Sequence, residues 1–194
     1  MFDAWIGLVH EGPRGVRLWA LIRHRGSRGA SRASSRGALG DHPLLEQLND
    51  AEMTKDVGGP ESPEQLAERQ SRYEEPGSRQ YRIVDGSSGE AVGWVGYWDH
   101  TWREEQVWET GWAVLPASQG RGIASAATSQ LLERARAQEH RRYVHAYPKV
   151  ENAPSNAICR KLGFELLGEV DFPVRREGVV RCNDWRFDLF ADGG

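Results

Sequence analysis

The residues best suited to chemistry in this chain form a glycine loop between a predicted strand and a predicted helix. The strand-like run Trp112–Leu115 ends at Pro116, and Gln119–Ala124 leads into an Ala- and Leu-rich stretch without glycine or proline. Glycine lets backbone N–H groups approach an anion closely, and the N–H groups of a first helical turn have no intrahelical partner. The order of strand, glycine loop and helix therefore predicts a seat for a phosphate-bearing ligand.

Two well-known nucleotide-binding loops fit this stretch poorly. A dinucleotide fingerprint needs a third glycine where Ser125 stands, and it needs a βαβ unit, whereas a predicted hairpin precedes this loop. The loop of nucleoside triphosphatases needs Gly-Lys-Ser/Thr after its glycines, and this sequence lacks it. From the loop alone, a glycine turn with a purely structural role stays open as the alternative.

The composition of the whole chain limits the class of protein. With 194 residues, of which 39% are hydrophobic and 27% charged, the sequence predicts one globular domain with a substantial core. A formal charge of −3 argues against nucleic acid or an anionic membrane as partner, and no apolar run reaches the roughly 20 residues of a membrane span. The N-terminus lacks a secretory pattern, and Cys159 and Cys182 lack the spacing of a disulfide scaffold or a metal site. We therefore expect a cytoplasmic protein that binds no metal.

Local patterns predict the elements that position the loop. Asp41–Asp50 has the pattern of a short helix with three leucines on one face, and Ser62 with Gln65 predicts a capping box at the start of a second helix. Two further helices are expected after Gly122 and over residues 152–162. The predicted strands are Tyr81–Val84, Ala91–Trp98, Gln106–Leu115, Tyr143–Tyr147, Phe164–Val170 and Asp184–Phe190. This order predicts a mixed α/β sheet in one domain.

Residues 1–38 differ in composition from the rest of the chain. Val16–Leu21 is typical of a strand, whereas Arg23–Gly37 is rich in Arg, Ser and Gly and has no apolar period. A flexible, solvated segment is the expected structure of Arg23–Gly37. A basic arm for RNA or an acidic partner is the alternative, because clustered arginines neutralise phosphates. We assign no function to residues 1–38.

Two motifs together resemble the Gcn5-related N-acetyltransferase (GNAT) superfamily. Gln119-x-x-Gly122-x-Ala124 matches the family's Q/R-x-x-G-x-G/A loop, three residues after the proline that ends the strand. The stretch Asn152–Phe164 is similar to the second family signature, N-x-x-S followed by five residues and K-x-G-F. It looks most like the branch that includes the ribosomal-protein N-terminal acetyltransferases and many antibiotic and small-amine acetyltransferases. The resemblance covers roughly residues 39–190.

The resemblance implies one acetyltransferase domain over residues 39–194, preceded by an atypical segment at 1–38. Its fold class is α/β: a mostly antiparallel twisted sheet, splayed between the fourth and fifth strands, with helices on both faces. Val16–Leu21 is the only local candidate for the family's first strand, and an unusually long insert separates it from the first helix. The resemblance also implies acetyl-coenzyme A as co-substrate.

The same resemblance implies how each part of acetyl-coenzyme A is held. The pyrophosphate would lie on backbone N–H groups of the loop, and the pantetheine arm would pair with the strand and contact an asparagine. The implied cofactor-binding residues are Trp112, Ala113, Val114, Gln119, Gly120, Arg121, Gly122, Ile123, Ala124, Ser125, Asn152 and Ser155. Arg121 either adds a positive charge or is a solvated loop residue, and Asn152 and Ser155 are also natural helix caps.

Direct acetyl transfer to an amine needs a base for the amine and a proton donor for the departing thiolate. Glu109, ten residues before Gln119, is the candidate base that the resemblance implies. Tyr147 lies where some relatives carry a catalytic glutamate, and there it would orient the substrate. Many relatives have a tyrosine as general acid at the position of Cys159. The proton donor is therefore left open between Cys159, Ser155 and water.

The acceptor site is expected between the first two helices, the Trp98–Gln106 connection and the Phe172–Arg181 turn. Five tryptophans within residues 94–112 form either an aromatic wall for the acceptor or part of the core. Seven acidic residues either attract a cationic amine or form a solvated face: Asp50, Glu52, Glu74, Glu75, Asp99, Glu104 and Glu105. His100 and His145 lie on strands that reach toward the same site.

Three functions are compatible with these residues. The first is an N-acetyltransferase that acts on the primary amine of a small molecule, an antibiotic or a metabolite. The second is an acetyltransferase for the α-amine of a protein N-terminus, and the third is a non-catalytic coenzyme A-binding module. The expected partner is thus a small-molecule amine or a peptide N-terminus. Dimers are common among the relatives, so a homodimer is one expected assembly.

Overall fold

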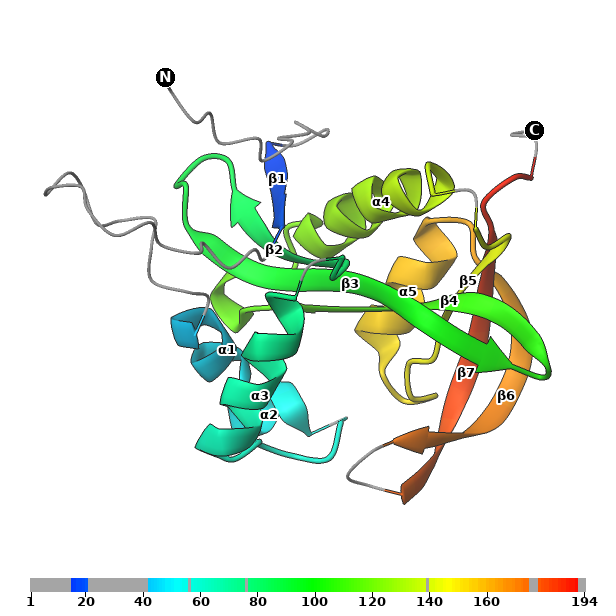
Figure 1. Ribbon diagram of the computed structural model, residues 1–194, viewed down its shortest axis with the longest axis horizontal. Helices are drawn as coiled ribbons and strands as arrows, with labels where there is room; N and C mark the ends of the chain where they lie inside the picture. The colour runs from blue at the N-terminus through cyan, green and yellow to red at the C-terminus, as the bar shows by residue number, and fades with distance from the viewer. Residues whose placement is uncertain are drawn as a thin grey trace, which may run out of the picture.

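The computed structural model describes residues 15–20, 42–55, 57–75, 77–138, 140–174 and 178–191. These residues form a twisted sheet with helices on both faces (Figure 1). Of the atypical segment at 1–38, only 15–20 belong to this part, so the predicted Arg/Ser/Gly-rich stretch lies outside the described residues. No helix within these ranges is long and apolar enough to cross a membrane.

Within the described ranges, seven strands form the sheet in the order β1-β2-β3-β4-β5-β7-β6. They are β1 (Val16–Ala20), β2 (Gln80–Asp85), β3 (Ala91–Trp102), β4 (Glu105–Val114), β5 (Tyr143–Ala146), β6 (Glu165–Val174) and β7 (Gly178–Asp188). Every neighbouring pair is antiparallel except β4 and β5, which run parallel. The predicted mixed sheet is confirmed, and β1 takes the place of the first strand by pairing with β2.

The α-helices are α1 (His42–Leu48), α2 (Ala51–Thr54), α3 (Pro63–Tyr73), α4 (Ile123–Arg136) and α5 (Ala153–Lys161). Helix α4 covers one face of the sheet, where it contacts β1, β3 and β4, and α1–α3 lie on the opposite face (Figure 1). Helix α5 contacts α4 and β6. The helices on both faces that the resemblance implied are therefore present.

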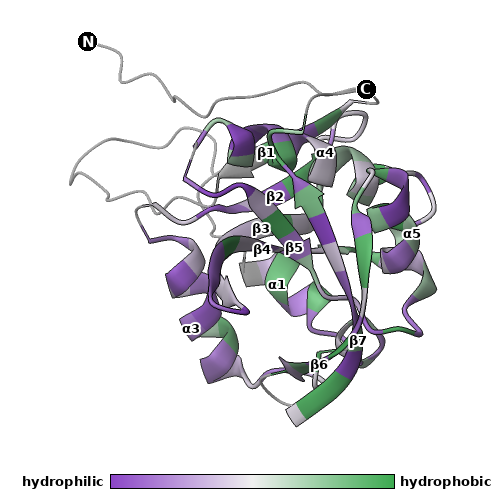
Figure 2. Cartoon of the chain, turned by 90° about the vertical axis from the view of Figure 1, so that its right-hand side faces the viewer, coloured by the Kyte–Doolittle hydropathy of each residue, from purple (hydrophilic) through white to green (hydrophobic). Residues whose placement is uncertain are grey.

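Short-range signals account for the helices next to the predicted acceptor site. The Ser62 side chain accepts a hydrogen bond from the Gln65 N–H, and the Gln65 side chain accepts one from the Ser62 N–H, so the predicted capping box is present. Leu44, Leu45 and Leu48 of α1 are buried, as the leucine spacing predicted. Helix α3 is mostly hydrophilic (Figure 2) and buries only Leu66 among its residues.

The main core lies between α4 and the sheet and fixes the direction in which α4 starts. Ile123, Ala127 and Leu131, at successive helical turns, are at most 6% exposed, and they join a cluster that includes Val95 and Trp108. Burial of this apolar stripe holds the helix against the strands. The N-terminus of α4 is thereby held next to the end of β4, where the glycine loop lies.

The hairpin formed by β6 and β7 is longer than the sequence predicted. The strands were expected to end at Val170 and to resume at Asp184, but the pairing continues to Val174 and Gly178. Pro173 and the exposed charged residues obscure the strand pattern here, because β6 is an edge strand that buries little of its surface. Val170, Phe172 and Cys182 form a second small core cluster that supports the extension.

The parallel contact between β4 and β5 extends over only two residue pairs. Trp108 pairs with Val144 and Glu109 with His145, after which β5 ends at Ala146 while β4 continues to Val114. The predicted splay between the fourth and fifth strands is confirmed. It leaves a stretch of β4 that has no strand on its β5 side within the described part of the chain.

Glycine at position 93 lets β3 and β4 approach each other near the loop. A methyl group on Gly93 would stand against the Ala113 carbonyl oxygen and 3.0 Å from the Val114 Cα, and backbone there has no room to move. We expect Gly93→Ala to lower the free energy of unfolding by about 2 kcal/mol through overpacking. Urea denaturation measures this loss. In the matched variant Gly96→Ala, the atoms nearest to the new methyl group belong to the end of the Gln80 side chain, which can move, so the loss should be clearly smaller. Equal losses would contradict the argument.

Candidate active site

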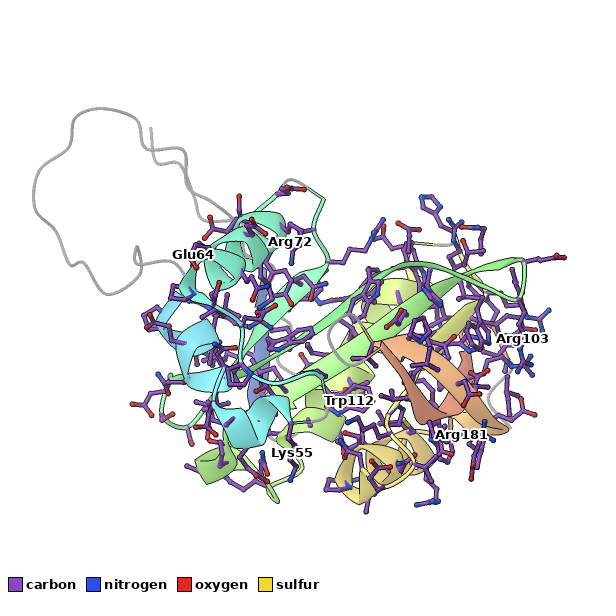
Figure 3. All side chains as sticks on the ribbon, turned by 90° about the horizontal axis from the view of Figure 1, so that it is seen from below. Lys55, Glu64, Arg72, Arg103, Trp112 and Arg181 are labelled. Carbon is purple, nitrogen blue, oxygen red and sulfur yellow. The ribbon has the colours of Figure 1, made fainter. Side chains whose placement is uncertain are left out.

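A cavity of about 960 Å³ lies where β4 and β5 separate. Its walls come from α2 and α3 on one side, from β3 and β4 in the middle, and from the β5–α5 connection and the β6–β7 hairpin on the other side. Figure 3 shows Trp112 in the middle, between Lys55 after α2 and Arg181 of β7. All three regions predicted for the acceptor site thus contribute to one cavity.

The glycine loop follows the end of β4, outside the residues that line this cavity, and presents N–H groups that have no helical partner. Gly120 and Gly122 have φ values of +71° and +75°, which residues with a side chain adopt only with strain. The first hydrogen bond of α4 runs from the Ala126 N–H to the Gly122 carbonyl at 3.0 Å, so the N–H groups of residues 123–125 have no intrahelical partner. The Gln119 side chain donates to the Val114 carbonyl at 2.9 Å and thereby fixes the loop to the end of β4. This arrangement fits a pyrophosphate.

Arg121 is anchored to a neighbouring turn. Its guanidinium lies 2.8 Å from a carboxylate oxygen of Asp85, the last residue of β2, and half of its side chain is exposed. Hydrogen bonds from Ser87 hold the pKa of Asp85 below its usual range, and Arg121 acts in the same direction. The carboxylate is thus charged at neutral pH. Arg121 connects the loop to the β2–β3 turn, so its positive charge beside the loop is shared with Asp85.

Strand β4 offers an unpaired backbone edge to the cavity. From Thr110 to Val114 it is paired with β3, but on its other side no strand of the described chain follows. Thr110, Gly111 and Trp112 line the cavity, and the Thr110 hydroxyl donates to the Gly96 carbonyl at 2.8 Å. A free edge of this kind can pair with the amides of an extended ligand. It therefore fits the pantetheine arm.

The β5–α5 connection carries Asn152 and Ser155, and both line the cavity. The Asn152 side chain accepts a hydrogen bond from the Ser155 N–H at 3.1 Å, so it caps α5 as predicted. The carboxamide nitrogen of Asn152 and the Ser155 hydroxyl are not needed for this cap. The contact of these residues with the cofactor stays a prediction.

Asn156 holds this connection in place, although no sequence motif had pointed to it. Asn156 is 6% exposed, and its amide nitrogen donates to the carbonyls of Lys149 at 2.9 Å and Asn152 at 2.8 Å. Its amide oxygen accepts from Asn183 at 2.7 Å and from the Trp185 indole at 2.8 Å. One buried side chain thus joins the loop, α5 and β7. An asparagine inside a short helix, where its propensity is low, was the available sequence signal.

Glu109 is the acidic residue at the point where β4 and β5 part. Its side chain is 17% exposed, and burial raises the pKa of Glu109 to about 7, although a hydrogen bond from Trp98 acts in the opposite direction. Desolvation disfavours the charged carboxylate, which explains the direction of this shift. A group with a pKa near neutrality accepts and releases protons efficiently at physiological pH. The geometry therefore fits the predicted base.

Tyr147 lies directly after β5 and belongs to an aromatic cluster on the cavity wall. Its ring stacks on Phe172 with 4.1 Å between the centroids, and it also contacts Trp102 and His100. Its hydroxyl is buried and makes no hydrogen bond within the described residues. Burial raises the pKa of Tyr147 well above its usual value, so the hydroxyl remains protonated. It therefore suits the predicted role of orienting a substrate.

Cys159 and His145 do not line the cavity. Cys159 is fully buried in the main core, and burial raises the pKa of its thiol to about 12. This geometry gives no support to a role of Cys159 as proton donor. His145 Nδ1 lies 2.7 Å from Asp184, whose other oxygen accepts from the Trp102 indole at 2.9 Å. The sequence did not reveal this buried network, because its members lie far apart along the chain.

The tryptophans divide between the cavity and the interior. Trp94, Trp98 and Trp112 line the cavity, whereas Trp108 is buried in the core and Trp102 is held by Asp184. A methyl group on Gly111 would lie 3.1 Å from Trp98 and 3.6 Å from Trp94, so both indoles cover this glycine. They form an aromatic wall next to the free edge of β4.

The predicted acidic attraction for a cationic acceptor is weak in this structure. Of the seven acidic residues considered, only Glu75 lines the cavity, together with Glu109. Three cationic side chains also line it: Arg72, Arg79 and Lys149. The cavity therefore carries no surplus of negative charge. Within the described residues, no group of three or more potential ligands could hold a metal ion.

Comparisons with known proteins agree with this geometry. A sequence model of the acetyltransferase (GNAT) domain matches residues 37–165, which is more than half of the chain. No curated protein matches the chain significantly.

Several solved structures share the fold. An acetyltransferase (GNAT family) from Bacillus anthracis has a TM-score of 0.71 and 17% identity, and the match covers 94% of this chain and 99% of that one. The ribosomal-protein-S5-alanine acetyltransferase from Vibrio fischeri has a TM-score of 0.67 and 12% identity, and the match covers 96% of this chain and 100% of that one. An aminoglycoside acetyltransferase in complex with coenzyme A has a TM-score of 0.61 and 19% identity, covering 76% and 89%. At these identities the likeness shows the fold.

The buried hydrogen bonds of Asn156 predict a large effect of its removal. Asn156→Ala leaves the Trp185 indole N–H and two loop carbonyls without their partner, so we expect a loss of about 2–4 kcal/mol in the free energy of unfolding. Urea denaturation measures the loss. Lys161→Ala, an exposed change on the same helix, is the control and should stay within about 0.5 kcal/mol of the unsubstituted protein. A stable Asn156→Ala variant would show that water replaces these hydrogen bonds.

Proposed function

The chain belongs to the GNAT acetyltransferase family, and from this premise we propose that it acetylates the primary amine of a small molecule with an apolar or aromatic body. The observation that carries the proposal is the aromatic cavity beside Glu109. Trp94 and Trp98 cover Gly111 on the wall, and Glu109, with a pKa raised to about 7, lies on the same strand two residues away. A cavity of about 960 Å³ is large enough for the reactive end of the cofactor together with a small acceptor.

Different segments around the splay bind different parts of acetyl-coenzyme A. The N–H groups after Gly122 hold the pyrophosphate, and the free edge of β4 from Thr110 to Val114 aligns the pantetheine arm. Asn152 contacts the same arm from the β5–α5 connection. When bound, acetyl-coenzyme A supplies the acetyl thioester whose C–S bond breaks as the new C–N bond forms. A backbone N–H of β4 then stabilises the negative charge that develops on the carbonyl oxygen.

Glu109 performs the proton transfer that makes the amine reactive. An alkylammonium group with a pKa near 10 is mostly protonated at neutral pH, and it must lose a proton before it can attack. Glu109 takes this proton directly or through water, and a second proton leaves the nitrogen as the amide forms. One proton returns to the thiolate, and the other is released to solvent. Ser155 lines the cavity, and its hydroxyl donates a hydrogen bond to the thiolate. Cys159 does not line the cavity and therefore cannot take this role.

The mixed charges that line the cavity favour an acceptor with one amine over an acceptor with several. Arg72, Arg79 and Lys149 face the same space as Glu75 and Glu109, so a molecule with several ammonium groups gains little there. Aromatic side chains, in contrast, bind an apolar body by burial and by stacking. We therefore favour a metabolite or antibiotic that carries one primary amine.

The α-amine of a protein N-terminus is the alternative acceptor. The motif at Asn152–Phe164 looks like the branch that includes ribosomal-protein N-terminal acetyltransferases, and Arg72 and Glu75 of the α3 side line the same cavity as Glu109. In this alternative, the peptide residues behind the amine would lie along the α3 side. A non-catalytic coenzyme A-binding module is disfavoured, because a buried carboxylate with a pKa near neutrality has no use in binding alone.

Glu109→Gln tests the base. The base acts only when deprotonated, so in the unsubstituted protein kcat/KM should rise with pH through about 7 and level off above it. The glutamine variant should lose about 10²–10⁴-fold in kcat and lose this acidic limb. Steady-state kinetics with release of coenzyme A thiol measures both. Glu75→Gln, on the same cavity, should retain both rate and pH profile, and an unchanged rate in Glu109→Gln would remove Glu109 as base.

Trp94→Ala tests the acceptor class. The thiol-release assay is first run over aromatic amines, aminoglycosides and short peptides, and we expect turnover with a monoamine of aromatic or apolar body. With that amine, Trp94→Ala should raise its KM by about fivefold and leave the KM of acetyl-coenzyme A unchanged, because a stacking partner worth about 1 kcal/mol is lost. Phe190→Ala, an exposed aromatic residue outside the cavity, is the control. Turnover with peptides alone would establish the alternative acceptor.

A further inference from the structure

A second titratable side chain contacts Glu109 inside the cavity. His100 Nδ1 lies 3.2 Å from Glu109 Oε2, with 23% of the histidine side chain and 17% of the glutamate side chain exposed. His100 of β3 pairs with Val107 of β4, two residues before Glu109, so the two side chains are diagonal neighbours on one face of the sheet. Their contact is therefore fixed by the register of two long strands rather than by a mobile loop.

The surroundings of His100 decide its protonation. Burial lowers the pKa of His100, His145 acts in the same direction, and Asp184 opposes them. The ring is thus neutral at pH 7, with one N–H and one lone pair. When Glu109 is ionised, its oxygen at 3.2 Å can only accept, so the neutral tautomer of His100 that satisfies this contact carries its proton on Nδ1.

The second ring nitrogen of His100, Nε2, has no hydrogen-bond partner within the described residues. His100 Nε2 and the Tyr147 hydroxyl are both buried and unpartnered within the described residues, although their rings lie 5.7 Å apart in the same cluster. Phe172 and Trp102 pack around the imidazole at centroid distances of 5.9 and 6.0 Å. These aromatic contacts hold the ring in place and leave its Nδ1 edge to Glu109.

We propose that His100 is the positioning residue of the base: its Nδ1–H fixes one carboxylate oxygen of Glu109, so that the other oxygen faces the acceptor amine. This inference rests on the proposed role of Glu109 in amine deprotonation. A free carboxylate on a strand rotates about its terminal torsion, and a hydrogen bond to one oxygen restricts that rotation. Because such a bond favours the charged form, we expect its removal to raise the pKa of Glu109 further.

The other ionisable groups near the pair are few. Tyr147 faces Glu109 from the end of β5, His145 and Asp184 face His100 from β5 and β7, and Arg103 acts on Tyr147 from the β3–β4 turn. Tyr147 remains neutral because its pKa is raised, and His145 is satisfied by Asp184. Among these groups, His100 alone makes a direct contact with the Glu109 carboxylate.

Two substitutions at position 100 separate the hydrogen bond from the shape of the ring. His100→Asn places an amide N–H where Nδ1 was, whereas His100→Phe keeps the ring and removes the donor. We expect His100→Phe to lower kcat about tenfold, with the KM of acetyl-coenzyme A unchanged, and to move the acidic limb of kcat/KM to higher pH. For His100→Asn, kcat and the acidic limb of kcat/KM should both stay close to those of the unsubstituted enzyme. In a Glu109→Gln background, His100→Phe should cost nothing further, because its effect passes through Glu109.

A titration that needs no acceptor tests the contact itself. In protein labelled with ¹³C at glutamate carboxyls, the Glu109 signal is identified by its absence in Glu109→Gln, and its midpoint should lie higher in His100→Phe than in His100→Asn or the unsubstituted protein. Equal midpoints in all three, or a full additional loss from His100→Phe in the Glu109→Gln background, would overturn the inference. If Glu109→Gln itself keeps full activity, the proposed base fails, while the titration still decides whether His100 holds the carboxylate. Melting temperatures of the variants establish that each is folded.

Discussion

The short parallel contact between β4 and β5 is the constraint on which the rest of the structure depends. Two residue pairs, ending at Glu109 and His145, hold the halves of the sheet together, and the strands part immediately afterwards. Because β4 continues without a partner on that side, its backbone amides stay available to a ligand, and the space between the strands becomes the cavity. The same β4 leads into the glycine loop and α4, so the free edge and the predicted anion seat follow each other along one segment of chain.

Glu109, the last residue of β4 that pairs with β5, is also the base that we propose. A carboxylate at this place is covered by aromatic side chains, and the resulting desolvation brings the pKa of Glu109 to about 7 instead of leaving it a fully charged surface group. Such burial is costly unless polar neighbours compensate. Trp98 and His100, both from β3, are those neighbours, and they contact Glu109 because the register of β3 and β4 places them on the same face. The strand pairing that builds the sheet thus also sets the protonation of the site.

Short-range features of this protein could be predicted from the sequence. The capping box at Ser62, the glycine loop at Gly120 and Gly122, and the cap of α5 by Asn152 depend on residues within a few positions of one another, and the structure contains all three. The long hairpin of β6 and β7 was underestimated, because an edge strand with few buried residues has no clear hydrophobic period.

The sequence by itself determined the order of the elements, the position of the anion-binding loop and a candidate carboxylate, because local patterns encode all of these. Only the tertiary structure decided which side chains meet in the cavity. It placed Cys159 in the core, joined His145 to Asp184, and brought His100 to Glu109. These contacts link residues on different strands and helices, and they depend on strand register and helix packing. No local spacing in the sequence specifies such a contact, since it exists only once the sheet has formed.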